Sequence, residues 1–586
     1  MKILPFTVFR AVAILAILIG ATLRTGADDG LRVSVYATAG DVLRYLATAP
    51  DREAVAQTGA RLRVARIFLE GRRGDEYVPP TLLAEARDFL EAKGIQVSGG
   101  IATVPGADFG KRQNGALDWL NWEDAKTRRD VAGFFTENAP IFRVLIVDDM
   151  FCTADTSPES DRARGQRSWS VYRCDLLNSS IQPLIVEPAR AARPSVRLIL
   201  KFPQWYDRFH LFGYDPSRMM ASFDQVWVGT EVRDPRTRRM GYVQPTEGYM
   251  NFRWLAANGG DKVVGAWFDH IECSAQNFLD QGYGSVLAGA RELTLFHLGD
   301  LMEGHPGDAL LAERLPELIE LEKRIRGQRR DGIAFYRPPG GDGEENLYLM
   351  DYLGMLGLPI LPVAVYPEGA RVVFLAVQAA ADPEINGHLS RHLRRGGTVV
   401  MTPAFVRRGG LAAAGLAGVE TRPVCEPGLA NTLEMGRRAI PLTAPFELDA
   451  GLQANGCQVL IGARDAGRVI PVLTSHRSGG GRVLVLNVRT FSEADFRESG
   501  EWLLAPKRLG WPQIPQGVAD RMREAMVDPL GVRFRAPAAV SLCLFGEGCC
   551  IYSYLDQPVE VRLNGERVRL GANQCLWRPF PRPRSR

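Results

Sequence analysis

Long apolar runs alternate with amphipathic stretches through the first half of the chain, and eight such alternations precede residue 300. Most runs are nearly continuous series of aliphatic residues, which is typical of strands covered on both faces in a parallel sheet. Eight strands, each followed by a helix, predict an α/β protein whose first domain is a (β/α)8 TIM barrel. The predicted strands are Leu31–Tyr36, Leu62–Glu70, Ile95–Val104, Ile141–Cys152, Ser195–Lys201, Phe223–Glu231, Lys262–Asp269 and Glu292–Leu298.

Polar residues gather where these runs end. The fourth run, IFRVLIVDDMFC, meets two adjacent carboxylates, Asp148 and Asp149. The carboxyl ends of barrel strands open into the mouth where barrel enzymes carry out chemistry, so we expect the strand-end side chains to share one face. The others are Glu70, Lys201, Glu231, Asp269, His270, Glu272, His297 and Asp300.

Two carboxylates facing each other across a sugar ring are sufficient for glycoside hydrolysis. Asp149 and Glu231 are the first candidate pair, because they end strands two steps apart around the barrel, and Asp269 is the reserve. Neighbouring strand residues point in opposite directions, so we expect only one of Asp148 and Asp149 to face inward while the other anchors a loop. The expected substrate-binding residues are Glu70, Asp148, Lys201, Trp205, Trp267, His270 and Glu272, with Tyr206 and Trp122 as further aromatic surfaces.

The second half of the chain predicts two more domains. A flavodoxin-like α/β unit is expected over 329–527, with strands and helices that alternate after the charged stretch near Arg326. Short alternating runs separated by Gly, Pro and Asn-Gly turns predict a small antiparallel β domain over 528–586. The predicted strands of the second unit are Gly332–Tyr336, Ile360–Val365, Arg371–Val377, Thr398–Thr402, Val459–Ile461 and Arg482–Asn487, with helices near Glu344–Leu356 and Asp382–Arg395.

The first 27 residues have a basic start and an apolar run over 11–21, the pattern of a secretory signal peptide, which leaves 28–328 for the barrel. An exported protein, periplasmic or extracellular, is therefore expected. An uncleaved anchor is the alternative, although the run is shorter than a bilayer requires. No later segment is apolar enough to span a membrane. The net charge of +4, spread without long blocks, indicates no nucleic-acid partner.

Metal and disulfide chemistry have weak signals. His388 and His392 stand four residues apart on one predicted helix, but no third ligand accompanies them, which favours a solvated face over a metal site. No cofactor motif occurs. A bridge between Cys152 and Cys174 and a pair of buried free thiols are both compatible with the sequence.

The order of barrel, flavodoxin-like unit and small β domain resembles the β-galactosidases whose barrel is followed by a glutamine-amidotransferase-like domain. The resemblance covers essentially the whole chain after residue 27 and lies in the architecture. It implies a second domain without catalysis of its own, with a packing or homo-oligomer-forming role. In agreement, the strand Arg371–Val377 continues into Gln378 and Ala379 with no nucleophilic cysteine at its end.

The strand-end residues depart from that family, because Asp148 and Asp149 stand where its Asn-Glu pair is usual. An Asp at the fourth strand is more similar to the α-galactosidase and α-glucosidase barrels, which implies a nucleophile at that place and an acid/base at the sixth strand, where Glu231 stands. We therefore expect a secreted glycosidase that acts on a poly- or oligosaccharide. The alternatives are a non-catalytic carbohydrate-binding or exopolysaccharide-assembly protein with a degenerate barrel, and a metal-dependent hydrolase using His270, Asp269, Glu272 and His297.

Overall fold

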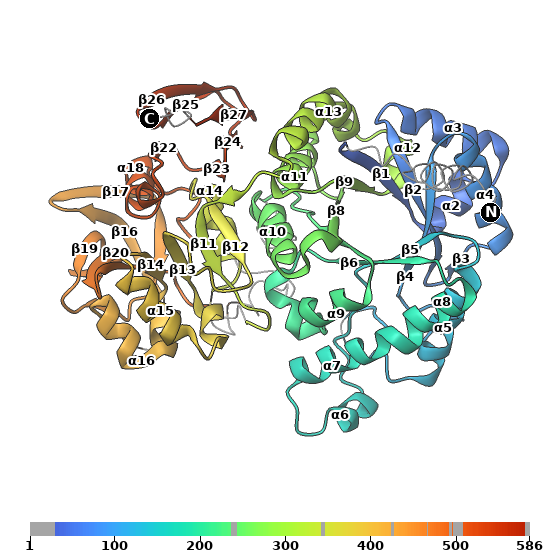
Figure 1. Cartoon of the computed structure of the whole chain (residues 1–586), viewed down its shortest axis with the longest axis horizontal. Coiled ribbons are helices and arrows are strands. Elements are labelled where there is room, and N and C mark those ends of the chain that lie inside the picture. Colours follow the sequence, from blue (N-terminus) through green and yellow to red (C-terminus); the bar gives the residue numbers. More distant parts are fainter. Residues whose placement is uncertain are drawn as a thin grey trace, which may run out of the picture.

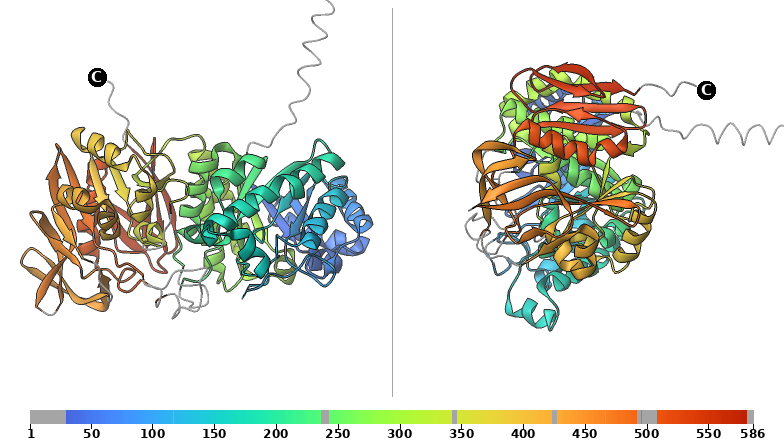
Figure 2. Two further views of the ribbon diagram at one scale, coloured as in Figure 1. Left: turned by 90° about the horizontal axis from the view of Figure 1, so that it is seen from below. Right: turned by 90° about the vertical axis from the view of Figure 1, so that its left-hand side faces the viewer.

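The chain forms an elongated molecule with a barrel at one end and two further domains at the other (Figure 1). The computed structural model describes residues 30–115, 117–235, 243–341, 346–422, 427–465, 467–491, 495 and 508–580. The predicted signal peptide lies outside the described residues. The left view of Figure 2 shows the barrel helices and the second domain side by side along the long axis.

Eight parallel strands close the barrel, in the order β1-β9-β8-β7-β6-β5-β4-β2 with β2 pairing back to β1. This confirms the predicted (β/α)8 barrel. The fourth predicted strand is shorter than its apolar run, because β5 ends at Val147 and leaves Asp148 and Asp149 in the following loop. The strands are β1 (Arg32–Ala37), β2 (Val64–Arg73), β4 (Gln96–Ala102), β5 (Val144–Val147), β6 (Arg197–Phe202), β7 (Gln225–Gly229), β8 (Val263–Asp269) and β9 (Glu292–Phe296), with β3 (Glu76–Tyr77) as a short hairpin partner of β2.

Helices surround the barrel, and several begin with a capping box. Thr38 and Thr48 each accept from the backbone three residues on, where an aspartate returns the bond. The helices are α2 (Ala39–Tyr45), α3 (Ala49–Ala60), α4 (Pro80–Ala92), α5 (Ala125–Asn138), α6 (Pro158–Arg164), α7 (Trp169–Ile181), η1 (Gln182–Val186), α8 (Glu187–Ala192), η2 (Tyr206–Phe212), α9 (Pro216–Ser222), α10 (Glu247–Gly259), η3 (Gly260–Lys262), α11 (Ala275–Ala288), α12 (Leu298–Glu303) and α13 (Pro306–Ile325).

Large side chains fill the barrel interior. Tyr36, Phe68, Trp227 and Trp267 are buried in one cluster there. A Cβ on Gly265 would lie 2.1 Å from the Trp227 indole, so this strand position has room only for glycine. The interior is therefore a packed core, and space for a ligand must be sought at its two ends.

The second domain is built on a nine-stranded sheet, in the order β12-β11-β13-β14-β21-β20-β19-β16-β17. The first five strands are parallel, as the sequence predicts. The other four are antiparallel, and the predicted strand at Val459–Ile461 belongs to this half as part of β19. The elements are β11 (Ile333–Tyr336), α14 (Leu349–Met355), β12 (Ile360–Val363), β13 (Val372–Leu375), η4 (Val377–Ala381), α15 (Ile385–Arg394), β14 (Thr398–Met401), α16 (Pro403–Ala417), β15 (Val419–Thr421), β16 (Gly428–Met435), β17 (Arg438–Leu448), β18 (Leu452–Ala454), β19 (Gln458–Asp465), β20 (Arg468–Ser478), β21 (Gly481–Leu486) and α18 (Gln516–Met526).

Two small antiparallel sheets complete the chain, in the orders β10-β23-β24-β27 and β22-β25-β26. One strand of the first sheet, β10, directly follows the barrel and pairs with β23 from the C-terminal part. The elements are β10 (Arg330–Asp331), η5 (Asp528–Leu530), β22 (Phe534–Arg535), β23 (Val540–Phe545), β24 (Gly548–Ser553), β25 (Val559–Leu563), β26 (Glu566–Leu570) and β27 (Cys575–Pro579).

Polar bonds join the barrel to the second domain. The Tyr206 hydroxyl donates to Asp351 at 2.7 Å, and Arg337 forms a buried ion pair with Asp207 at 2.8 Å. The Arg337 guanidinium also lies 3.8 Å from the centre of the Trp254 ring. Tyr206, expected among the sugar-stacking residues, is thus part of this domain contact.

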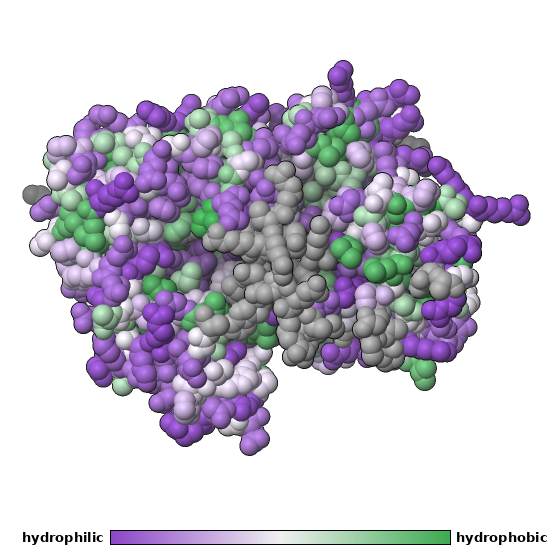
Figure 3. Space-filling view, turned by 180° about the vertical axis from the view of Figure 1, so that it is seen from behind, coloured by the Kyte–Doolittle hydropathy of each residue, from purple (hydrophilic) through white to green (hydrophobic). Residues whose placement is uncertain are grey.

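Several minor predictions are decided by the structure. Cys152 and Cys174 are both buried free thiols, so no bridge joins them. His392 is buried, so the expected solvated face is wrong for this residue, and His388 pairs with Glu368 at 2.8 Å. No helix within the described ranges is long and apolar enough to cross a membrane. On the face shown in Figure 3, hydrophobic residues form separate small groups among hydrophilic ones.

Candidate active site

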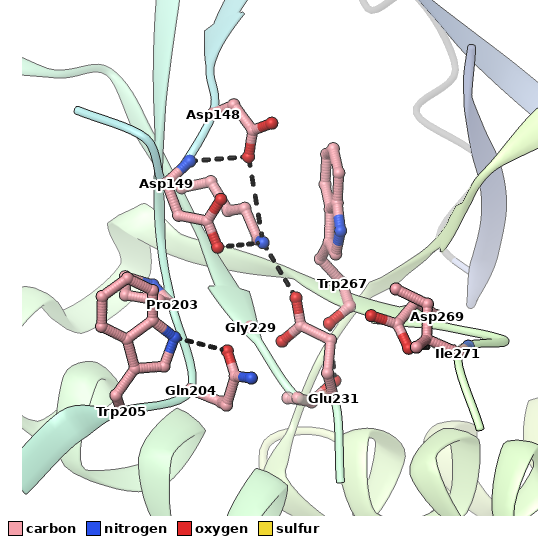
Figure 4. A network of polar contacts seen from close by, with 12 residues as sticks. Asp148, Asp149, Pro203, Gln204, Trp205, Gly229, Glu231, Trp267, Asp269 and Ile271 are labelled. Carbon is pink, nitrogen blue, oxygen red and sulfur yellow. Dashed lines mark hydrogen bonds and ion pairs between the residues drawn. The ribbon is translucent and has the colours of Figure 1, made fainter. Parts of the chain in front are cut away.

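A single ammonium group holds the two candidate carboxylates at the mouth of the barrel. Lys201, near the end of β6, places its Nζ 2.6 Å from Asp149 Oδ2 and 2.8 Å from Glu231 Oε1. The two oxygens can therefore lie no farther apart than these two lengths together. All three side chains are buried, and Figure 4 shows Asp149, after β5, and Glu231, after β7, turned toward each other, with β6 between the two strands.

Asp148 belongs to the same group, and this corrects the expected alternation of Asp148 and Asp149. Its Oδ1 accepts from the Asp149 backbone N–H at 2.6 Å and lies 3.9 Å from Lys201 Nζ. Alternation does not apply here, because both residues follow the end of β5 and have left the strand. Asp148 is thus bonded to the loop backbone while it still faces the lysine.

Arg73 connects Asp148, which follows β5, to Glu70, which lies with Arg73 on β2. Its guanidinium donates to Glu70 at 2.9 Å twice and to Asp148 Oδ2 at 3.0 Å. Glu70 also accepts from the Tyr36 hydroxyl at 2.6 Å and is fully buried. Each of its two oxygens is therefore committed to protein donors, which makes Glu70 a support for the Asp148 side of the mouth.

Asp269, the reserve candidate, is held by a different cation. Arg233 binds it with two parallel bonds, 3.1 Å to Oδ1 and 2.6 Å to Oδ2. The Ile271 backbone N–H donates to Oδ1 as well, at 3.1 Å. Such a forked ion pair fixes both oxygens, whereas the Oε2 of Glu231 is buried and has no hydrogen-bond partner among the described residues.

Aromatic rings flank the group. The Lys201 Nζ lies 4.7 Å from the centre of the Trp267 ring, which itself packs against Tyr36 with 4.5 Å between ring centres. Trp205 is stacked on Trp119 at 5.8 Å, and its Nε1 donates to Gln204 at 2.8 Å. Both tryptophans are nearly buried, and Figure 4 places them on opposite sides of the acids.

The pKa values of the three acids around Lys201 shift in different directions. Burial raises the pKa of Asp149 well above its usual range; Lys201 opposes this, and the Asp148 charge adds to it. Burial likewise raises the pKa of Glu231 against the opposing charge of Lys201. For Asp148, the bond from Asp149 and the charges of Lys201 and Arg73 outweigh burial and lower the pKa. Lys201 keeps its proton, because its three acids raise its pKa more than burial lowers it.

Some predicted site residues lie apart from this group. His270 bonds to Asp308 at 2.8 Å and stacks on Phe278 at 4.0 Å between ring centres, on the outer side of β8. Glu272 is exposed in the loop that follows, with a φ of 50°. His297 bonds to Asp41 at 2.8 Å, and Asp300 lies between the two histidines. No group of three or more His, Cys, Asp or Glu in the described part of the chain could hold a metal ion.

Sequence reasoning missed the two arginines that hold the outer acids. Arg73 follows Glu70 by three residues, and the register of β2 with β4 shifts between Glu70 and Arg72. Such a bulge re-aims the side chains that follow it, and nothing in the local sequence marks it. Arg233 follows Glu231 by two residues, a spacing that could have suggested a cation beside the strand-end acids.

The barrel domain matches a known protein family in sequence. Residues 21–309 match the model of a family described as probable glycosyl hydrolase, catalytic domain. The match covers the barrel and stops before the two domains that follow. The first domain is thus similar to a glycosyl hydrolase catalytic domain in sequence, and its closed barrel agrees with that similarity.

A curated relative and several solved structures add to this. An uncharacterized protein of Saccharolobus solfataricus is 25% identical over 333 residues, which cover 51% of this chain and 55% of that protein. The chain therefore spans about half the length of this relative. Among solved structures, the chain is similar to a β-galactosidase from Rahnella sp. R3 at 13% identity, with a TM-score of 0.62 and coverage of 95% of this chain and 99% of that one.

An α-L-fucosidase of Paenibacillus thiaminolyticus is similar at 11% identity, with a TM-score of 0.61 over 94% of this chain and 98% of that one. At such identities the likeness is one of fold. Because it extends over nearly the whole of both chains, it confirms the multidomain architecture inferred from the sequence.

Proposed function

We propose that this protein is an exported glycoside hydrolase that cleaves a poly- or oligosaccharide, with Asp149 and Glu231 as its working pair. Asp269 and Asp148 shape the charge around the pair, and Trp267 and Trp205 offer ring faces to a sugar. Export rests on the signal-like first 27 residues, and the carbohydrate partner rests on the glycosidase-type barrel. The second domain is proposed to pack against the barrel and to form oligomers, without catalysis.

One observation carries the proposal: a single lysine nitrogen binds both carboxylates. That shared contact keeps their nearest oxygens within the roughly 5 to 5.5 Å separation of retaining glycosidases, short of the about 6.5 to 9.5 Å that an inverting enzyme needs for its water. We therefore propose a retaining mechanism, in which one carboxylate attacks the anomeric carbon and the other protonates the departing oxygen.

The charges suggest which acid carries the proton. Asp149 adjoins the ionised Asp148, and its pKa is raised well above the usual range chiefly by burial. Glu231 faces both Lys201 and Arg233, whose charges favour its ionised form against burial. We assign proton donation to Asp149 and attack to Glu231, the reverse of the roles that the α-galactosidase resemblance implies.

A kinetic comparison of amide variants tests the proposal. Release of the aryl group from a panel of aryl glycosides identifies a substrate, which is then given to Asp149→Asn, Glu231→Gln and Asp269→Asn. Removing either working carboxylate is expected to lower kcat by about a thousandfold or more, with little loss of stability, because catalysis requires the proton and the charge. Asp280→Asn, a buried acid away from the mouth, is the matched control.

Near wild-type turnover by Asp149→Asn and Glu231→Gln, with loss of turnover in Asp269→Asn, would contradict the proposed pair. The catalytic acid would then be Asp269 at the end of β8. Binding of a polysaccharide without any turnover of the panel would favour the non-catalytic alternative.

A further inference from the structure

A cavity at the amino-terminal end of the barrel, opposite the catalytic mouth, carries an excess of arginine. Its volume is about 320 Å³, and it lies where the chain leaves the barrel between α13 and β10. The helices that border it, α10, α11 and α13, form the side of the barrel nearest the other domains (Figure 1). The charged lining consists of Arg253, Arg291, Arg326, Arg330, Asp261 and Glu322.

Three of these arginines have no acidic partner among the described residues. Arg253 donates to the Ala288 carbonyl at 3.0 Å, Arg330 to the Leu287 carbonyl at 3.3 Å and Arg291 to the Asp261 carbonyl at 3.1 Å. Their hydrogen bonds thus go to neutral acceptors only. In contrast, Arg326 is held by Glu322 through two bonds of 2.7 and 2.8 Å.

Two of these arginines, Arg253 and Arg330, are partly buried. The Nε atoms of Arg253 and Arg330 are buried and have no hydrogen-bond partner within the part of the chain that the structure describes. Burial, and then the nearby charge of Arg330, lowers the pKa of Arg253 to about 10. Holding like charges together in a partly desolvated cavity is costly unless an anion compensates them.

The backbone conformation at Gly289 leaves room for the Arg330 guanidinium. Gly289 adopts a φ of 107°, and a Cβ there would lie 2.7 Å from Arg330 Nη2. Any side chain at this position would both strain the turn and displace the Arg330 guanidinium. The glycine therefore preserves the guanidinium's place in the cavity wall.

We propose that this cavity binds a small molecule through an oxyanion group, a phosphate, sulfate or carboxylate, held by Arg253 and Arg330. The guanidinium fork matches the paired oxygens of such groups. The cavity volume lies at the lower end of the range for small-ligand pockets, about 300 Å³ and upward, so it has room for a sugar-sized body beyond the oxyanion. The inference is independent of the chemistry at the mouth.

Binding measurements on the full chain test the site with three probes: inorganic phosphate, sulfate and glucuronate. Titration calorimetry at constant ionic strength gives the Kd, and the rise in thermal midpoint with ligand concentration gives a second readout. We expect at least one probe to bind with a Kd below about 10 mM. The probe that binds best identifies the class of oxyanion.

Charge variants locate the binding. Arg253→Gln and Arg330→Gln should each weaken the bound probe about tenfold, the value of one charge-assisted hydrogen bond. Asp261→Asn, an exposed change that removes a negative charge from the lining, should tighten binding about two- to threefold. Arg324→Gln, on α13 but outside the cavity, is the matched control and should leave the Kd unchanged.

Failure of all three probes to bind the wild-type protein at 10 mM would overturn the proposal. So would binding that Arg330→Gln and Asp261→Asn leave unaltered, because the anion would then lie elsewhere on the surface.

Discussion

The barrel mouth and the parallel half of the second sheet have the same strand arrangement, but different side chains stand at their strand ends. Both present the carboxyl ends of parallel strands. In the barrel those ends carry buried acids that converge on Lys201. In the second sheet a neutral amide takes the equivalent place: Asn346 Oδ1 accepts from Thr402 at 2.8 Å and from the Val377 N–H at 3.1 Å. The same topology can therefore carry either a cluster of charged side chains or a set of neutral hydrogen bonds at its strand ends. The side chains at those ends determine which of the two forms.

The largest effect on stability and turnover is expected from removing Lys201, the cation that the three acids share. Lys201→Met leaves Asp148, Asp149 and Glu231 buried without their common partner, so we expect a loss of about 3 to 5 kcal/mol in unfolding free energy. A fall of about a hundredfold or more in kcat should accompany it. Urea unfolding and turnover are measured together. Lys262→Met, which removes an ammonium that donates to the Met220 and Phe223 carbonyls at the far end of the barrel, should cost stability but spare kcat. Equal kinetic effects in both variants would argue against a catalytic mouth at Lys201.

Asp280 is a buried acid that has no cationic partner among the described residues. Its titration therefore reports how burial affects the pKa of a carboxyl group. It accepts from Gln276 at 2.7 Å and from Tyr552, and no ion pair of Asp280 occurs among the described residues. Burial raises its pKa to about 6. The folded state therefore holds this proton more tightly than the unfolded state, and stability is lost as pH rises from about 4 to about 6.

Asp280→Asn should remove that loss. Above pH 7 we expect the variant to gain up to about 3 kcal/mol, the equivalent of about two pKa units, reduced by any weakening of the bonds to Gln276 and Tyr552. Near pH 3.5 the gain should vanish. Unfolding free energies across this pH range provide the measurement, and a gain that is independent of pH would refute the titration of Asp280.

The neutral end of the second sheet should matter for stability alone. Asn346→Ala leaves Thr402 and the Val377 N–H without their acceptor, so a loss of about 1 to 3 kcal/mol is expected. The kcat of the folded variant should equal that of the wild type. A specific loss of kcat would show that the second domain contributes to the chemistry.

Cys457 should show the smallest effect. It lies near the antiparallel half of the sheet, and burial raises its pKa, which disfavours the reactive thiolate. Cys457→Ser should leave both glycoside turnover and stability within about 0.5 kcal/mol of the wild type. Cys425, which lies outside the described residues, is substituted in parallel. Glutaminase activity that either change abolishes would overturn the expectation of a silent domain.

Within the second domain, the sequence predicted the parallel strands well and the antiparallel ones poorly, for a physical reason. Strands covered on both faces are continuous apolar runs, such as the one that contains β5, and stand out without an alignment. The strand β17 instead alternates exposed and half-buried residues along most of its length and contains two prolines. Such a pattern is also typical of a loop, so the sheet extension of the second domain went unrecognised.

The candidate site shows a similar division. Asp149, Lys201 and Glu231 could be predicted because each follows or ends an apolar run, and barrel topology brings those ends together. Their mutual contacts depend on loop geometry after β5, which alternation could not supply. The roles of Arg73 and Arg233 depend on a bulge and on a residue with a φ of 58°, features that the local sequence does not reveal.

Chemical rescue by azide tests whether Asp149 and Glu231 both act on the anomeric centre. Asp149→Ala and Glu231→Ala proteins are given an aryl glycoside substrate with and without sodium azide, and the anomeric configuration of the product is read by NMR. The account predicts that azide restores turnover in both: Glu231→Ala should yield a glycosyl azide of inverted configuration, because azide replaces the nucleophile. Asp149→Ala should yield one of retained configuration, because azide then attacks the glycosyl-enzyme. Rescue of Asp269→Ala alone, with neither of the other two responding, would contradict the account.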